Sequence, residues 1–217
     1  MFIVILGPPG AGKGTQAARI ARSLRIPQVA TGDMFRKHLG EGTELGWLAR
    51  SFMDAGALVP DEVVCEMVQD RLQEPDCAEG ALLDGFPRSL AQSEFLDRML
   101  AERGQRVDRV VSLVVPDEEV VSRMGGRRTC LSCGATYHVR FSPPKVEGVC
   151  DRCGQPLVQR PDDREDTVRA RLATYHRQTS PIVEHYRQGG VVLDVDGVGS
   201  IDAISEAIAR GIEAVRR

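Results

Sequence analysis

The sequence has no long hydrophobic run. The apolar stretch at its N-terminus, Phe2–Leu6, stops at a glycine, far short of the ~20 apolar residues that cross a bilayer. No basic segment precedes this run and no small-residue cleavage site follows it, so it does not resemble a secretory signal. We therefore expect a cytoplasmic protein that makes no contact with membranes.

An excess of charge of one sign is also missing. The chain has 28 basic and 31 acidic residues, a net charge of −3, and only 5% aromatic residues. A basic surface that attracts nucleic acid, with aromatic rings interleaved to stack on bases, is therefore not expected. Basic residues do gather between Arg123 and Arg171, which is compatible with a local site for anions.

Cysteine is scarce but clustered. Four of the six cysteines form two Cys-x-x-Cys pairs, Cys130 with Cys133 and Cys150 with Cys153, separated by sixteen residues. In a reducing compartment such pairs indicate metal ligands rather than disulfides. Four thiolates fill a tetrahedral shell and leave no open position, so the spacing predicts a structural zinc site. Iron also accepts four thiolates, and the sequence alone does not choose between the two metals.

Short apolar runs alternate with longer helical patterns along most of the chain. This alternation predicts an α/β fold with an open parallel sheet. Aspartates directly after prolines, Asp61 and Asp117, are expected to cap two of the helices. Strands are expected at Met1–Leu6, Ala81–Leu83, Arg109–Val115 and Val191–Val195. Helices are expected at Gln16–Leu24, Asp61–Gln73, Ser89–Glu102, Asp117–Met124, Asp166–Tyr186 and Ile201–Val215.

A glycine-rich loop, Gly7–Thr15, follows the first strand and opens the first helix. Such a loop directs backbone N–H groups at a phosphate, the helix N-terminus adds positive charge, and Lys13 reaches the outer phosphates. Gly14 stands directly after the lysine, so the hydroxyl of Thr15 comes one residue later than in the common phosphate-loop pattern. Mg²⁺ is therefore expected to be held mainly by nucleotide phosphates and water.

Several motifs together resemble the adenylate kinase family. They are GPPGAGKGTQA from Gly7, TGDMFR from Thr31, DAGALVPDE from Asp54, LLDGFPRS from Leu82 and PPKVEGVCDRCG from Pro143. The resemblance covers nearly the whole chain, and the four cysteines resemble the zinc-bearing, long-lid bacterial form. It implies a P-loop nucleoside-monophosphate-kinase-like fold of three layers, and a monomer that converts ATP and AMP into two ADP.

The resemblance also implies three parts. Residues 1–29, 60–125 and 164–217 would form the core, residues 30–59 an AMP-binding segment (the AMP segment), and residues 126–163 a zinc-bearing lid (the lid segment). It assigns ATP contacts to Gly10, Ala11, Gly12, Lys13, Gly14, Thr15, Arg123, Arg127, Thr136, Tyr137 and Gly199. It assigns AMP contacts to Thr31, Arg36, Ala57, Leu58, Val59, Gly85, Phe86, Pro87, Arg88, Gln92, Arg160 and Arg171.

The chemistry of phosphoryl transfer explains why cations dominate these assignments. Two polyanions must be brought together, so catalysis depends on positioning and charge neutralisation rather than on a general base. Guanidinium groups bind phosphate oxygens in pairs. Asp84, at the end of a strand, is expected to orient water bound to Mg²⁺. The expected catalytic residues are Lys13, Asp84, Arg88, Arg127, Arg160 and Arg171.

Some residues have two interpretations. Asp162 and Asp163 either cap the following helix or form a hinge latch that bonds to lid groups when the lid is closed. Gln92 either pairs with the adenine edge or is an ordinary helical glutamine. Arg123 either stacks on the ATP base or ends a solvated helix.

Two other functions share part of the pattern. A UMP or CMP kinase would have the same fold and chemistry, but Thr31, Gln92 and the cysteine-bearing insertion favour AMP. A zinc-ribbon module that binds nucleic acid or protein, with a regulatory phosphate loop, would also contain paired Cys-x-x-Cys motifs. The acidic net charge and the few aromatic residues near the cysteines disfavour that second alternative.

Overall fold

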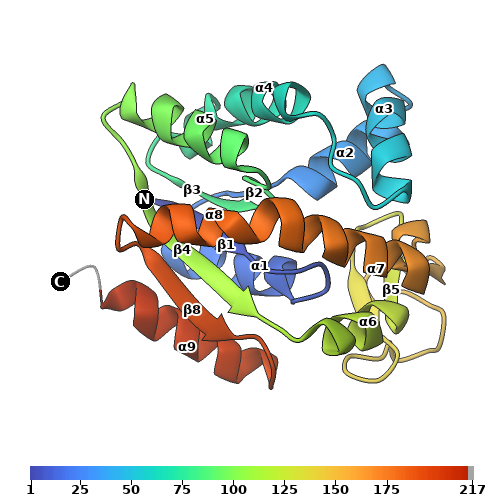
Figure 1. Cartoon of the computed structure of the whole chain (residues 1–217). Helices are drawn as coiled ribbons and strands as arrows, with labels where there is room; N and C mark the ends of the chain where they lie inside the picture. Colours follow the sequence, from blue (N-terminus) through green and yellow to red (C-terminus); the bar gives the residue numbers. More distant parts are fainter. Residues whose placement is uncertain (215–217) are drawn as a thin grey trace.

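A five-stranded parallel sheet forms the centre of the computed structural model, which describes residues 1–214 (Figure 1). The strand order is β2-β3-β1-β4-β8, and each neighbouring pair is parallel. This confirms the α/β prediction. The strands are β1 (Phe2–Leu6), β2 (Gln28–Ala30), β3 (Ala81–Asp84), β4 (Val107–Val114) and β8 (Val192–Asp196).

Helices cover both faces of this sheet, which explains why β1 is apolar at every position. Phe2, Val4 and Leu6 point into one hydrophobic core, while Ile3 and Ile5 point into the other. The first core includes α4 (Asp61–Leu72), α5 (Leu90–Ala101) and α8 (Ser180–Arg187). The second includes α1 (Lys13–Leu24), α6 (Asp117–Gly125), α7 (Glu165–Thr174) and α9 (Ile201–Glu213). The result is the expected three-layer arrangement.

The AMP segment contains two helices, α2 (Thr31–Gly40) and α3 (Glu44–Asp54). The two helices cross at Gly46, where an added Cβ would lie 2.3 Å from the backbone nitrogen of Leu39. Only glycine permits so close an approach. The side chain of Thr43 caps α3 by accepting a hydrogen bond from the Gly46 N–H.

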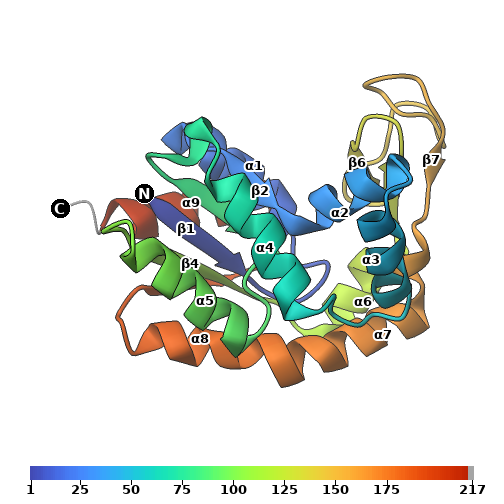
Figure 2. The ribbon, with the colours of Figure 1, turned by 90° about the horizontal axis from the view of Figure 1, so that it is seen from above.

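The lid segment forms a second, antiparallel sheet of order β6-β5-β7. Its strands are β5 (Arg127–Cys130), β6 (Thr136–His138) and β7 (Leu157–Val158). A 3₁₀ turn, η2 (Pro161–Asp163), leads from this sheet into α7. The small sheet and the α2–α3 pair lie at the end of the molecule opposite both termini (Figure 2).

The helix expected at Asp166–Tyr186 is interrupted. Between α7 and α8, residues Tyr175–Thr179 form a π-helical turn, η3, and α8 begins with Pro181 in its first turn. Proline has no N–H to donate and its ring displaces the carbonyl of the preceding turn, so a regular α-helix cannot pass through it. The prediction of one continuous helix was therefore wrong at its centre.

Other differences from the sequence prediction are local. Strand β2 was not expected, because Val29 is its only fully buried apolar residue. Asp61 and Asp117 are the first residues of α4 and α6 and do not cap them, since the caps are Pro60 and Pro116. The expected end of the last helix at residue 215 lies outside the described residues. No helix within residues 1–214 is long and apolar enough to span a membrane.

Candidate active site

The phosphate loop lies at the carboxyl end of β1, between Leu6 and the first residue of α1, Lys13. Gly7, Gly10 and Gly12 have positive φ angles of 145°, 75° and 89°. At Gly10 an added Cβ would approach the side chain of Met124 to 2.7 Å. The loop therefore requires glycine for both its backbone conformation and its contact with α6.

Lys13 points back across this loop. Its Nζ donates hydrogen bonds to the carbonyl oxygens of Gly7 and Pro8, each at 2.7 Å. One of its three N–H donors is left for a ligand. Burial lowers the pKa of Lys13 to about 7, and the negative charge of Asp84 opposes this shift.

Asp84 ends β3, next to β1 in the sheet. One carboxylate oxygen lies 3.4 Å from the position that a Cβ on Gly14 would occupy, so the group faces the start of α1. Burial raises the pKa of Asp84, while Lys13 and Arg88 act in the opposite direction. Gln28 donates a long hydrogen bond of 3.4 Å to the same carboxylate. A partly buried carboxylate beside a phosphate loop is the kind of group that holds Mg²⁺ through water.

A cavity runs from the phosphate loop to the AMP segment. It brings together Lys13, Arg36, Arg88 and Arg171, four cations from separate parts of the chain, together with Asp162. Its walls also include most of the residues expected to contact AMP: Thr31, Arg36, Ala57, Leu58, Val59, Gly85, Pro87, Arg88, Gln92 and Arg171. Phe86 and Arg160 do not line it. The Phe86 side chain is instead fully buried in the first core, and its peptide bond to Pro87 is cis.

Short polar contacts fix the floor of this cavity. The hydroxyl of Thr31 and the Nε of Arg88 both donate to the carbonyl of Gly85, at 2.8 and 2.7 Å. Thr179 in the π-helical turn donates to the carbonyl of Arg88 at 2.8 Å. Burial lowers the pKa of Arg88, and Asp84 opposes the shift. The Arg88 guanidinium is thus a desolvated cation held in one place, which suits it for a phosphate group.

Arg171 also meets two further cations, Arg127 and Arg160, at the base of the lid segment. The guanidinium of Arg127 pairs with Asp163, with its Nε 2.8 Å from one carboxylate oxygen. Arg171 bonds to Asp162 at 2.7 Å, and Arg160 lies 3.3 Å from the same carboxylate. Burial lowers the pKa of Arg160 and of Arg171 to about 10. Three cations face two carboxylates, so the cluster retains positive charge for an anion. Neither Asp162 nor Asp163 caps α7, whose N-cap residue is Arg164, and both carboxylates bond to arginines instead.

Gln92 is held at both ends of its side-chain amide. Its Oε1 accepts from the backbone N–H of Arg88 at 2.7 Å, and its Nε2 donates to Asp61 at 2.7 Å. The hydroxyl of Ser89 caps α5 by accepting from the Gln92 N–H and donates to the other oxygen of Asp61. Gln92 is therefore a buried, oriented side chain in the cavity wall and not an exposed helical glutamine.

The remaining residues expected to contact ATP lie outside the cavity. Arg123 donates to Glu119 and to the carbonyl of Gly197, which places it beside the turn that contains Gly199. Thr136 and Tyr137 lie on β6, and the Tyr137 hydroxyl accepts from the backbone N–H of Asp151 at 2.9 Å. Arg123, Thr136 and Tyr137 do not line the cavity.

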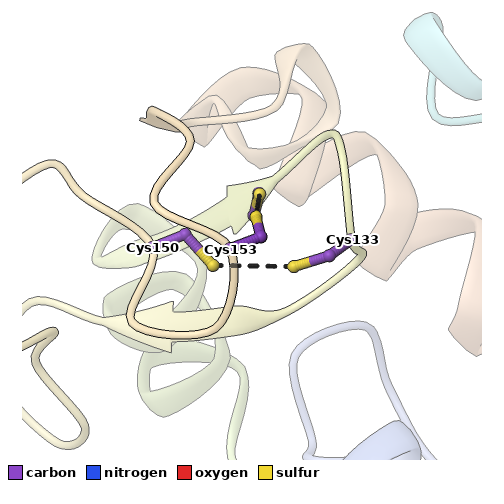
Figure 3. Close-up of side chains that lie close together, drawn as sticks. Cys133, Cys150 and Cys153 are labelled. Carbon is purple, nitrogen blue, oxygen red and sulfur yellow. Dashed lines mark hydrogen bonds between the residues drawn. The ribbon is translucent and has the colours of Figure 1, made fainter.

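The four expected metal ligands meet in the lid segment. The sulfur atoms of Cys130, Cys133, Cys150 and Cys153 all lie within 4.8 Å of one another. Cys130 and Cys153 are 3.4 Å apart, and Cys133 and Cys150 are 3.5 Å apart (Figure 3). A Zn–S distance of ~2.3 Å places tetrahedral sulfurs about 3.8 Å apart, so the cluster has nearly the size that a zinc ion requires.

Sequence reasoning missed several residues in the cavity wall. Thr174 ends α7, and Tyr175 and Thr179 come from the π-helical turn. Phe35 and Met53 come from α2 and α3. Phe35 is next to Arg36 in the sequence, which was a usable signal. The others carry no motif, because their position depends on how distant helices pack.

Comparison with known proteins agrees with this geometry. A model of the adenylate kinase family matches residues 5–191. An adenylate kinase of Archaeoglobus fulgidus is 51% identical over 216 residues, which is 100% of both chains. An adenylate kinase of Syntrophobacter fumaroxidans is 55% identical over 204 residues, covering 94% of this chain and 96% of its own. One of Moorella thermoacetica is 53% identical over 212 residues, 98% of each chain. This chain therefore belongs to the adenylate kinase family of nucleoside monophosphate kinases, which are phosphotransferases.

Proposed function

We propose that the chain transfers a phosphoryl group reversibly between ATP and AMP to give two ADP, with the cavity as the AMP site and the phosphate loop as the ATP site. The observation that carries this assignment is the convergence of Lys13, Arg36, Arg88 and Arg171 on one cavity that begins at the phosphate loop. Mutual repulsion between two nucleotides is the main obstacle to their reaction, and these cations offset it.

The AMP site divides into an apolar part and a charged part. Ala57, Leu58, Val59 and Phe35 supply apolar surface for the base and ribose. Arg36, Arg88 and Arg171 supply guanidinium groups for the phosphate, and Arg160 lies beside them. The amide of Gln92 offers both a donor and an acceptor to the adenine edge.

On the ATP side, the backbone of Gly10–Thr15 and Lys13 would hold the outer phosphates. We assign the adenosine end to Arg123, Thr136, Tyr137 and the backbone at Gly199, and a phosphate contact to Arg127. The lid segment would then swing over ATP and exclude water, which would otherwise accept the phosphoryl group. Arg127 would leave Asp163 to reach the phosphates in the closed form.

Asp84 fits the role of the residue that orients Mg²⁺-bound water, since its carboxylate faces the first turn of α1 beside Lys13. Mg²⁺ bound with ATP supplies further neutralisation of phosphate charge. In the reaction itself, the attacking atom is an AMP phosphate oxygen that is already ionised at neutral pH. No side chain has to remove a proton.

The metal of the lid segment is proposed to be zinc with a structural role. Four sulfur ligands leave no position for a substrate. Hydrogen bonds from the Tyr137 hydroxyl and from the backbone lower the pKa of the Cys150 thiol to about 6, although burial opposes the shift. The neighbouring Cys130, Cys133 and Cys150 sulfurs raise the pKa of the Cys153 thiol to about 12, so metal binding to four thiolates would release protons. Family membership also supports a cytoplasmic monomer with no nucleic-acid or membrane partner.

A coupled assay of ADP formation from ATP and Mg²⁺ tests the assignment. AMP, UMP, CMP and GMP are offered separately, and fast turnover is expected with AMP alone. Turnover with UMP or CMP would keep the mechanism and change the substrate. Arg88→Met should reduce the turnover number with AMP by roughly 10²–10³, as loss of one charge-stabilising group does. A wild-type protein that turns over none of the four would refute the proposed function.

A further inference from the structure

Asp61 is the first residue of α4, yet its carboxylate serves the neighbouring helix. Oδ1 accepts from Gln92 Nε2 and Oδ2 accepts from Ser89 Oγ, each at 2.7 Å. Neither bond caps α4, whose cap residue is Pro60. The carboxylate therefore joins the first turn of α4 to the first turn of α5.

These contacts leave the Gln92 amide one orientation. An ionised carboxylate can only accept hydrogen bonds, and the Arg88 backbone N–H can only donate one. The nitrogen of the amide must face Asp61 and its oxygen must face Arg88. A flipped amide would set two donors against each other at one end and two acceptors at the other. Gln92 is 1% exposed, so water cannot relieve such a mismatch.

The orientation decides what the cavity can recognise. Gln92 lines the cavity with one N–H and one oxygen lone pair still unused. An adenine base presents a 6-amino donor beside the N1 acceptor, whereas a 6-oxopurine presents an acceptor beside an N1–H donor. In one binding pose, a fixed amide complements only one of these patterns. A freely flipping amide would complement both.

We propose that Asp61 is a specificity-determining positioning residue, which holds the Gln92 amide in the orientation that selects 6-aminopurine monophosphates over 6-oxopurine monophosphates. This inference rests on the proposed function, in which the cavity holds AMP. Asp61 touches no substrate in this scheme and acts through Gln92.

The test compares AMP with IMP, because the two nucleotides differ only at the purine edge concerned. The quantity measured is the ratio of kcat/KM for AMP to that for IMP. Asp61→Asn preserves shape but can donate as well as accept, so the ratio should fall roughly tenfold, the usual effect of losing one oriented buried hydrogen bond. The change should appear in KM for AMP, with kcat and KM for ATP nearly unchanged.

Glu62→Gln is the matched control, because it removes the same charge from the same helix end at an exposed residue. It should leave the ratio unchanged. Ser89→Ala provides a second variant that keeps the carboxylate but removes its other anchor. It should lower the ratio in the same direction by a smaller factor.

A double-substitution cycle decides whether Asp61 acts through Gln92. Gln92→Leu removes the amide, and in that background Asp61→Asn should change the ratio no further. A wild-type ratio in both Asp61→Asn and Ser89→Ala would overturn the inference, as would an equal effect of Asp61→Asn in both backgrounds. A wild-type enzyme that fails to use AMP would instead refute the proposed function.

Discussion

The central sheet and the lid segment are stabilised by different means within one chain. In the sheet, strands such as β1 are buried at every position and helices cover both faces. Among residues 126–163, the buried hydrophobic residues are Cys130 and Cys150, which are themselves expected metal ligands. Five other apolar side chains of the segment are exposed: Leu131, Val139, Phe141, Val146 and Val149.

This difference explains why a metal would stabilise the lid segment more than the sheet. A segment of fewer than about 40 residues buries too little apolar surface to offset its loss of conformational entropy. Metal–thiolate bonds at the proposed site would replace that missing burial, because such a site forms only in the folded segment. The sheet, which has two hydrophobic cores, needs no such bonds.

Removal of the metal should have the largest effect. Structural zinc contributes on the order of 10 kcal/mol to the folding of small metal-binding domains. Chelation, or the double variant Cys130→Ser with Cys150→Ser, should therefore unfold the lid segment and leave the core folded. Limited proteolysis should cut between residues 131 and 156, and metal content by mass spectrometry should fall from one ion per chain to none.

The control for this experiment is Cys77→Ser, which changes a buried cysteine outside the cluster. It should keep the metal. If chelation unfolds core and lid together in one transition, the two regions are not independent and the comparison fails.

A cavity in the core should have the next largest effect. Leu83 on β3 is fully buried, whereas Leu131 beside a metal ligand is 73% exposed. Leu83→Ala should lower the free energy of unfolding by about 2–5 kcal/mol, because it removes buried methyl groups and leaves a void. Leu131→Ala should change it by less than about 0.5 kcal/mol. Urea unfolding of both variants measures the difference, and similar losses would contradict the contrast between the two regions.

The smallest predicted effect is a change in the protonation of Lys13 when ATP binds. The pKa of Lys13 in the nucleotide-free site is about 7, because burial disfavours its charge. Bound phosphates favour the charged form and raise this pKa, so ATP binding should take up a proton at pH 8. ATP affinity should fall by at most about tenfold per unit as the pH rises above about 7. Calorimetric titration in buffers with different ionisation heats measures the uptake.

The variant Lys13→Arg separates proton uptake by Lys13 from titration of Asp84. The pKa of Asp84 is raised by burial. Arginine stays charged throughout this pH range, so the variant should bind ATP without taking up that proton. Uptake that is the same in wild type and variant would assign the proton to another group.

Much of the architecture could be predicted from local patterns. The apolar run of β1 and the glycines of the phosphate loop determine their own conformations, and the spacing of the four cysteines is sufficient to predict one cluster. Strand β2 was harder to predict, since it owes its existence to pairing with β3 rather than to its own composition.

The polar interior of the site could not be predicted in this way. The sequence suggested that Asp61 caps its own helix, but its carboxylate reaches α5 because α4 and α5 pack side by side. Thr179 of the π-helical turn reaches the cavity beside Arg88, to whose carbonyl it donates a hydrogen bond although 91 residues separate the two. Such contacts join segments distant in sequence, and a pattern along the chain does not record them.

The ion pair between Arg127 and Asp163 has a consequence for protein engineering. It brings the two ends of the lid segment within hydrogen-bonding distance of each other, so residues 128–162 form an excursion that leaves and re-enters the core at one point. Closing the ends of such an excursion costs little extra entropy when its length changes. The segment can accordingly be exchanged for a different one. An insert whose two ends lie equally close together, with or without a metal, can replace it while the parallel sheet keeps its register.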